Sequence, residues 1–226
     1  MARDDLLAEL DAWAEARDPG CETVAYGGHG DQVADVRRGD GERNAILLHG
    51  GFWRPEWTRS TTHALAVDLA VRGWTSWNVE YRRSGLEDML ADVAAALERC
   101  GPGTVIGHSA GGHLALWAAA TARAERVVSL AGVTDLARAA REGIGGNAAV
   151  DLAGADPPAH ADPMRLLPLR ASALLVHGTE DDRVPVDYGR AYAAASGAEL
   201  LELPGVGHFD VIDPRSAAWA DVVARL

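Results

Sequence analysis

A serine flanked by glycines lies near the middle of the chain, in the segment Gly107-His108-Ser109-Ala110-Gly111. The segment fits the pattern Gly-x-Ser-x-Gly, follows a short apolar run and precedes an alanine-rich stretch typical of a helix. A sharp strand-to-helix turn forces such a serine into a strained backbone conformation, and the glycines are needed because a Cβ would collide with neighbouring backbone. The pattern alone is common by chance, but with these flanking elements it predicts that Ser109 is a nucleophile at the start of a helix.

Two later loops carry residue types that could activate this serine. His208 lies in the glycine-rich segment Gly205-Val206-Gly207-His208, and acidic residues follow an earlier apolar run. We predict that His208 is the general base and that Asp181 orients it, with Asp182 as a close rival and Asp135 as a weaker candidate. A lone histidine in such a loop usually has no catalytic role, but the chain order Ser, Asp, His is one in which catalytic triads occur.

A further loop, His49-Gly50-Gly51-Phe52-Trp53, directly follows an apolar run of strand length. Acyl transfer forms an oxyanion at its tetrahedral stage, and each preorganised N–H group that meets it is worth about 3 kcal/mol. Glycines allow the loop to approach the reacting carbon closely. We therefore assign the oxyanion hole to the backbone N–H groups of Gly51, Phe52 and Ala110. His49 is expected to be a buried hydrogen-bonding support of the loop and not a base.

Aromatic residues near this loop indicate the kind of substrate. Trp53 is expected to form a wall of the substrate pocket, and His108 is expected to line the site or pack beneath it. Phe52 and Trp53 leave little room for a large acyl group, so the acyl side is expected to be small. Trp53 and Trp57 favour an aromatic leaving group.

Short apolar runs alternate with longer helical patterns along most of the chain, which predicts parallel strands joined by right-handed helical crossovers. The predicted strands cover residues 45–48, 74–81, 104–106, 126–130, 173–176 and 199–203, and the predicted helices cover 61–72, 86–99, 110–121, 187–195 and 215–226. Before them, a helix within residues 1–20 precedes two β-like runs at 22–26 and 31–37, expected to form an antiparallel hairpin at the sheet edge. The candidate residues follow strand ends, where open α/β sheets place their sites.

Residues 133–170 interrupt this alternation, because they contain no strand-like run and are punctuated by glycine and proline. Long insertions of this kind are usually functional, so we predict a short lid over the strand ends. The chain of 226 residues is otherwise expected to form one α/β domain, with helices on both faces of a mostly parallel sheet.

Composition argues against several classes of function. Lys plus Arg number 21 against 33 Asp plus Glu, and the net charge of −12 disfavours binding to nucleic acid or anionic lipid. Lysine is absent, which excludes a lysine nucleophile, and the 2 cysteines and scattered histidines do not suggest a metal site. The acidic N-terminal segment lacks the features of a secretory signal, and no stretch has the length of a membrane helix. We therefore expect a cytoplasmic monomer or homodimer that acts on a small molecule, away from membranes.

From about residue 39 to its C-terminus the chain resembles a small α/β-hydrolase. The loop His49-Gly50-Gly51-Phe52-Trp53 matches the HGGxW pattern of the serine-hydrolase kynurenine formamidases and related small esterases. The strand-to-helix turn that carries their nucleophile is similar to the segment Gly107-His108-Ser109-Ala110-Gly111-Gly112-His113-Leu114. The resemblance implies an α/β-hydrolase fold, with Ser109 as nucleophile, Asp181 as acid and His208 as base. It also implies cleavage of an N-formyl aryl amine or a small carboxylic ester without a cofactor.

Other classes of function stay open. A non-catalytic receptor on this fold is expected to lack or misplace a triad member, and all three candidates are present. A thioesterase that serves a biosynthetic synthase is expected to carry a larger acyl pocket and a surface for a carrier domain. A dehalogenase would place a carboxylate at Ser109. The sequence favours a serine hydrolase that cleaves a small ester or an N-formyl aryl amide through an acyl-enzyme.

Overall fold

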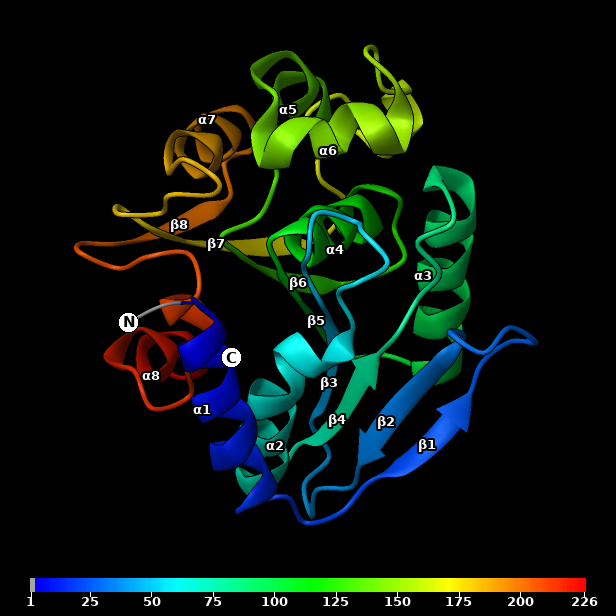
Figure 1. Ribbon diagram of the computed structural model, residues 1–226, viewed down its shortest axis with the longest axis vertical. Coiled ribbons are helices and arrows are strands. Elements are labelled where there is room, and N and C mark those ends of the chain that lie inside the picture. The colour runs from blue at the N-terminus through cyan, green and yellow to red at the C-terminus, as the bar shows by residue number, and fades with distance from the viewer. Residues whose placement is uncertain (1–2) are drawn as a thin grey trace.

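An eight-stranded sheet forms the centre of the fold in a computed structural model that describes residues 3–226 (Figure 1). Its strands lie in the order β1-β2-β4-β3-β5-β6-β7-β8. Their bounds are Glu22–Ala25 (β1), Val33–Arg37 (β2), Asn44–Leu48 (β3), Thr75–Val79 (β4), Thr104–His108 (β5), Arg126–Leu130 (β6), Ser172–Gly178 (β7) and Glu199–Leu203 (β8). The strand pairs β1–β2 and β2–β4 are antiparallel, and the other neighbours are parallel. The predicted mostly parallel sheet with an antiparallel hairpin at its edge is confirmed.

Helices cover both faces of this sheet. They are α1 (Arg3–Glu15), α2 (His63–Val71), α3 (Leu86–Cys100), α4 (Ala110–Ala120), α5 (Leu136–Glu142), α6 (Ile144–Ala153), α7 (Asp187–Ser196) and α8 (Ala217–Val223). Single 3-10 turns lie at Arg59–Thr62 (η1), Ala159–Ala161 (η2) and Asp210–Ile212 (η3). None of the helices within the described residues has the length and apolar character needed to cross a membrane.

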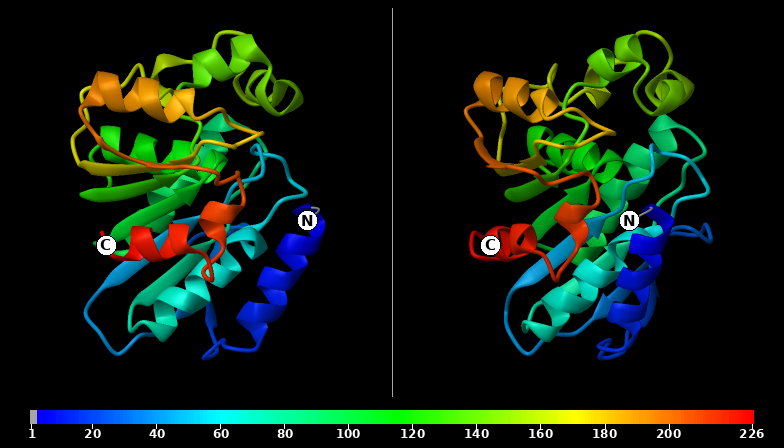
Figure 2. Two further views of the ribbon diagram at one scale, coloured as in Figure 1. Left: turned by 90° about the vertical axis from the view of Figure 1, so that its left-hand side faces the viewer. Right: turned by 60° about the vertical axis from the view of Figure 1, so that its left-hand side comes forward.

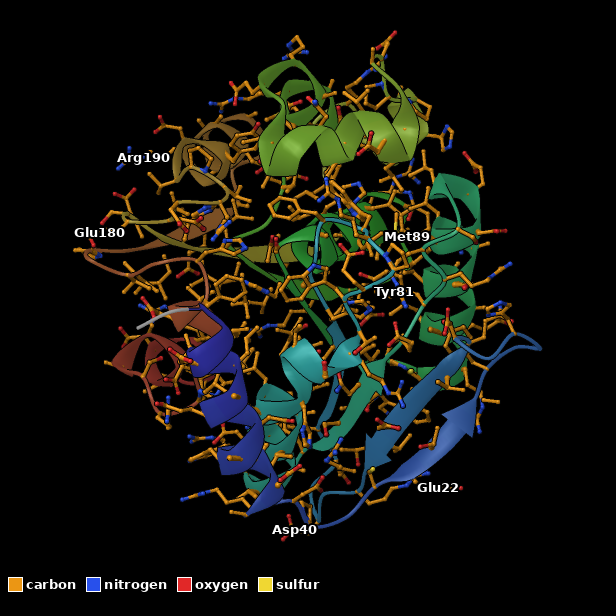
Figure 3. All side chains as sticks on the ribbon, viewed as in Figure 1. Glu22, Asp40, Tyr81, Met89, Glu180 and Arg190 are labelled. Carbon is orange, nitrogen blue, oxygen red and sulfur yellow. The ribbon has the colours of Figure 1, made fainter. Side chains whose placement is uncertain are left out.

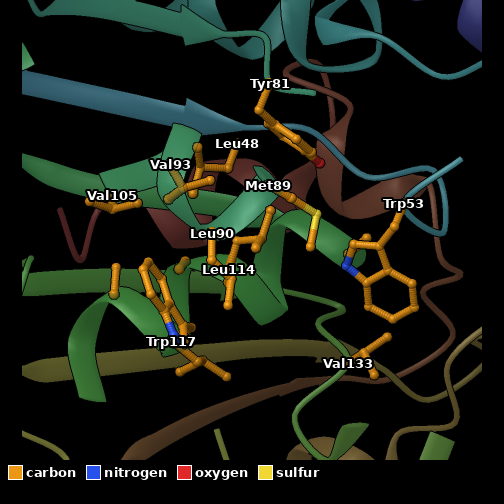
Figure 4. Close-up of a cluster of buried hydrophobic side chains, with 14 of the residues drawn as sticks. Leu48, Trp53, Tyr81, Met89, Leu90, Val93, Val105, Leu114, Trp117 and Val133 are labelled. Carbon is orange, nitrogen blue, oxygen red and sulfur yellow. The ribbon is translucent and has the colours of Figure 1, made fainter. Parts of the chain in front are cut away.

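The alternation of side chains along each strand divides the core into two layers. Ile46 and Leu48 of β3 pack with residues of α3 and α4, whereas Ala45 and Leu47 pack with residues of α2 and α8 on the opposite face. Both layers exclude water, which explains why the central strands read as continuous apolar runs. Figure 4 shows part of the α3–α4 layer, including Leu48, Met89 and Leu114. Tyr81 and Met89 lie inside the molecule in Figure 3, and both side chains are 0% exposed.

The segment between β6 and β7 holds α5, α6 and η2 and contains no strand among its residues, all of which the structure describes. In Figures 1 and 2 it lies at the same end of the molecule as α7, away from α1 and α2. The start of α6 is irregular, because Gly145, Gly146 and Asn147 have positive φ angles of 64°, 66° and 66°. Two of the three are glycines, which adopt this left-handed conformation at little cost.

Candidate active site

Ser109 lies at a sharp turn between β5 and α4, with φ 55° and ψ −116°. A positive φ is strained for a residue with a Cβ, and the neighbouring glycines make the turn possible. A Cβ at Gly107 would lie 2.0 Å from the carbonyl oxygen of Gly111, and a Cβ at Gly111 would lie 2.0 Å from that of Leu48. The strand-turn-helix that the motif predicts is therefore present, and its close backbone packing requires both glycines.

His208 and Asp181 are brought together from the loops that follow β8 and β7. The Nδ1 atom of His208 lies 2.7 Å from the Oδ2 atom of Asp181, whose side chain is fully buried. The Oδ1 atom of Asp181 accepts hydrogen bonds from the backbone N–H groups of Arg183 at 2.9 Å and Val184 at 2.8 Å. Burial raises the pKa of Asp181, but hydrogen bonds from His177, His208 and Val184 outweigh it and hold that pKa well below its ordinary value. A permanent carboxylate only accepts, so it fixes a proton on Nδ1 of His208.

The rival carboxylates lie elsewhere. The side chain of Asp182 is 72% exposed and its oxygen is 3.4 Å from the Nε of Arg183. Asp135 is the N-cap of α5 and accepts a hydrogen bond from the N–H of Arg138 at 2.7 Å. Asp181 is thus the predicted acid that the structure brings to the imidazole of His208.

His108, the last residue of β5, packs against His208. The two ring centroids are 4.7 Å apart, and Nε2 of His108 lies 3.0 Å from the backbone carbonyl oxygen of His208. Burial, reinforced by the nearby charge of His208, lowers the pKa of His108 to about 3. His108 is therefore neutral, donates from Nε2 to that carbonyl and holds the loop that carries His208.

A cavity of about 530 Å³ lies beside the candidate site, and Ser109 and His208 both line it. Aromatic side chains form much of its wall: Phe52, Trp57 and Phe209. Charged side chains also reach it, from Arg54, Glu56, Asp182 and Arg183. The insertion between β6 and β7 contributes Gly145 and Gly146 to the cavity wall.

The loop predicted to form the oxyanion hole presses directly on the turn at Ser109. A Cβ at Gly50 would lie 2.9 Å from both the His108 carbonyl oxygen and the Ser109 Cβ. Gly51 and Phe52 line the cavity. Ala110 begins α4, so its N–H group has no acceptor within the helix. The three predicted donors therefore lie in the two segments that border Ser109.

Trp53 occupies a different position from the one predicted. Trp53 is 4% exposed and belongs to the core (Figure 4). Its ring meets the ring of His113 edge-on, with centroids 5.5 Å apart. Phe52 and Trp53 have positive φ angles of 51° and 57°, and this sharp turn separates the directions of neighbouring side chains. The tryptophan in the wall of the cavity is Trp57.

Two residues that bear on the site have no role in the sequence-based prediction. Arg54 donates through Nη2 to the carbonyl oxygens of Gly145 at 2.9 Å and Gly146 at 3.2 Å. These bonds join the loop predicted to form the oxyanion hole (residues 49–53, here named the oxyanion loop) to the insertion. Glu80, which follows β4, contacts the ring of His49 at 2.9 Å. Arg54 directly follows the segment 49–53 and Glu80 lies in the run predicted as a strand at 74–81, but their partners lie far along the chain. Within the described part of the chain, no group of histidine, cysteine or carboxylate side chains could hold a metal ion.

Comparison with solved structures supports the fold. A candidate thioesterase from Silicibacter sp. TM1040 superposes with a TM-score of 0.80 at 21% identity, covering 96% of this chain and 89% of its own. A thermophilic esterase from Thermogutta terrifontis gives a TM-score of 0.71 at 20% identity over 92% of this chain and 90% of its own. Esterase B from Lactobacillus rhamnosis gives 0.74 at 18% identity over 98% and 89%. At such identities the likeness establishes the α/β-hydrolase fold alone.

Comparison at the level of sequence establishes the family. No curated protein matches the chain. The family model described as "Serine hydrolase" matches residues 49–226, which include the oxyanion loop, the turn at Ser109 and the loops of Asp181 and His208. A match over this share of the chain shows that the protein belongs to the serine hydrolase family.

Proposed function

We propose that this hydrolase cleaves a small carboxylic ester or an N-formyl aryl amide, with Ser109 as nucleophile, His208 as base and Asp181 as its orienting acid. The observation that carries the proposal is the 2.7 Å contact between His208 Nδ1 and Asp181 Oδ2, beside the cavity that Ser109 lines. With the proton fixed on Nδ1, the lone pair of Nε2 is available to take the hydroxyl proton of Ser109. Membership of the serine hydrolase family supports the same assignment.

The proposed reaction proceeds in two halves. Ser109 attacks the acyl carbon as His208 takes its proton, and the N–H groups of Gly51, Phe52 and Ala110 stabilise the oxyanion. His208 then protonates the departing alcohol or amine, which leaves an acyl group on Ser109. A water molecule, activated by His208 in the same way, releases the acid and restores the serine.

The volume and the aromatic lining of the cavity support a substrate with an aromatic leaving group. Its volume of about 530 Å³ falls in the range typical of small-molecule sites. Phe52, Trp57 and Phe209 provide aromatic surface against which an aryl group can pack. The HGGxW pattern of the oxyanion loop, similar to that of the kynurenine formamidases and related esterases, points to the same class of substrate.

A hydrolysis panel tests this proposal. N-formylkynurenine, short and medium p-nitrophenyl esters and acyl thioesters are compared by kcat/KM, because that ratio measures discrimination in the transition state. We expect short esters or the formamide to rank first. A thioester in first place would favour the thioesterase alternative, and binding without turnover would favour a receptor.

A matched pair of serine variants tests the nucleophile. Ser109→Ala should lower kcat for p-nitrophenyl acetate by about 10⁴-fold or more, because no hydroxyl is left to form the acyl-enzyme. Ser172→Ala serves as the control, since Ser172 is exposed at the start of β7, at the opposite end of that strand from Asp181. A Ser109→Ala protein that retains the wild-type rate would overturn the proposal.

A further inference from the structure

The oxyanion loop begins at a buried histidine that is held on three sides. The ring of His49 is 0% exposed, and its Nε2 atom lies 2.9 Å from Oε1 of Glu80. Its Nδ1 atom lies 2.8 Å from the carbonyl oxygen of Gly50. The ring stacks on Tyr81 with centroids 4.3 Å apart and an angle of 12° between the planes. The Tyr81 hydroxyl also donates to the backbone carbonyl of His49 at 2.7 Å, so this ring has a fixed orientation.

Both ring nitrogens of His49 face groups that only accept hydrogen bonds. A backbone carbonyl has no proton to give. Glu80 accepts from the backbone N–H groups of Arg59 at 3.0 Å and Tyr81 at 3.2 Å, and from the guanidinium of Arg83. These three donors do not belong to His49, and together they favour the ionised form of the Glu80 carboxyl. Glu80 is therefore ionised and accepts only.

A ring with a single proton cannot satisfy this arrangement. Its unprotonated nitrogen would present a lone pair to the lone pair of an acceptor oxygen. That oxygen is either the Gly50 carbonyl, 2.8 Å from Nδ1, or Oε1 of Glu80, 2.9 Å from Nε2. With a proton on each nitrogen, both contacts become good hydrogen bonds, and the bond to Glu80 is assisted by charge.

We propose that Glu80 holds His49 as a doubly protonated imidazolium, and that this pair positions and polarises the oxyanion loop. The catalytic part of this inference rests on the proposed function, whereas the charge of His49 does not. His49 and Glu80 are positioning residues, because they act through the backbone of the loop.

The link to the loop runs through one peptide group. The carbonyl of Gly50 and the N–H of Gly51 belong to the same planar peptide and point in opposite directions. A hydrogen bond from Nδ1 of His49 to that carbonyl therefore fixes the direction of the Gly51 N–H, one of the assigned oxyanion donors. A charged donor on the carbonyl also polarises the peptide and strengthens its N–H as a donor. Because Glu80 lies on the far side of the ring, the positive end of the pair faces the loop.

Nuclear magnetic resonance of the isotopically labelled wild-type protein tests the charge directly. Long-range proton–nitrogen correlations report which ring nitrogens carry protons, and His49 is assigned through its backbone connectivity. At about pH 7.5 a histidine in water is mostly neutral. We expect two protonated ring nitrogens on His49 and one on His108. A single protonated nitrogen on His49 overturns the proposal, and this result does not depend on whether Ser109 hydrolyses any substrate.

Glu80→Gln tests the positioning role, with Glu98→Gln as a control that makes the same charge change at an exposed site on α3. In Glu80→Gln we expect His49 to lose one ring proton. We expect kcat for p-nitrophenyl acetate to fall by about 10- to 100-fold with KM within about twofold, because the loop acts on the transition state. The control should keep the wild-type kcat. An unchanged kcat or an unchanged protonation of His49 in Glu80→Gln overturns the role of Glu80. If Glu80→Gln fails to fold, the wild-type spectrum still decides the charge of His49.

Discussion

Replacing Asp181 by asparagine should reverse the polarity of its hydrogen bond to His208 without removing the bond. Oδ1 of Asp181 accepts from the N–H groups of Arg183 at 2.9 Å and Val184 at 2.8 Å, and Oδ2 lies 2.7 Å from Nδ1 of His208. An asparagine NH2 group cannot take the position of Oδ1, because it would face two other donors. The amide oxygen must stay there, so the NH2 group faces His208. Nδ1 must then accept, and the ring proton moves to Nε2, the nitrogen that should take the proton of Ser109.

This change of tautomer sets the size of the effect. Serine hydrolases with the wrong histidine tautomer lose about 10⁴-fold in kcat, which corresponds to about 5 kcal/mol of activation free energy. We expect this loss for Asp181→Asn with p-nitrophenyl acetate, and a KM within about threefold because the cavity wall is unchanged. Asp182→Asn, at a side chain that is 72% exposed, should retain kcat within about twofold. Circular dichroism confirms that both variants fold. An Asp181→Asn protein that keeps more than about a tenth of the wild-type kcat would refute the reasoning.

Two further predictions concern stability. A Cβ at Gly107 would lie 2.0 Å from the carbonyl oxygen of Gly111, so Gly107→Ala should lower the free energy of unfolding in urea by about 3 kcal/mol. Gly28→Ala, whose Cβ meets no atom within 4 Å, should change it by less than about 0.5 kcal/mol, and equal losses would contradict the steric argument. Burial raises the pKa of Asp18, but hydrogen bonds from Arg37 and other groups lower it from 3.8 to about 2. Because the folded pKa is the lower one, this stabilisation is complete above about pH 4 and is lost as the pH falls toward about 2. Asp18→Asn should flatten the fall of Tm over that range, and an unchanged slope would contradict the assignment.

Local patterns in the sequence predict most of the elements. The apolar run at residues 45–48 is β3 (Asn44–Leu48), and the run at 199–203 is β8 with the same bounds. Helix ends are less well predicted, because they depend on single capping contacts. The helix expected at 215–226 is Ala217–Val223, and Ser216 caps it by accepting from the N–H of Trp219.

The parts of the site that depend on contacts between distant residues could not be predicted from local patterns in the sequence. Asp181 and Asp182 are adjacent and chemically identical, and only the path of the loop decides that the first reaches His208. The positive φ angles of Phe52 and Trp53 direct the indole of Trp53 into the core, and neither residue type favours that conformation. The contact of Glu80 with His49 joins the ends of two parallel strands, so it requires the order of the sheet.

The amino-acid sequence by itself predicted a nucleophile turn, an oxyanion loop and a general base at the ends of buried strands. It could do so because glycine spacing and apolar periodicity act over a few residues. The tertiary structure alone decided which carboxylate contacts His208, which tryptophan lines the cavity and which acid contacts His49. Those choices depend on side-chain directions and distances of a few ångströms between segments far apart in the chain, and only the packed sheet sets them.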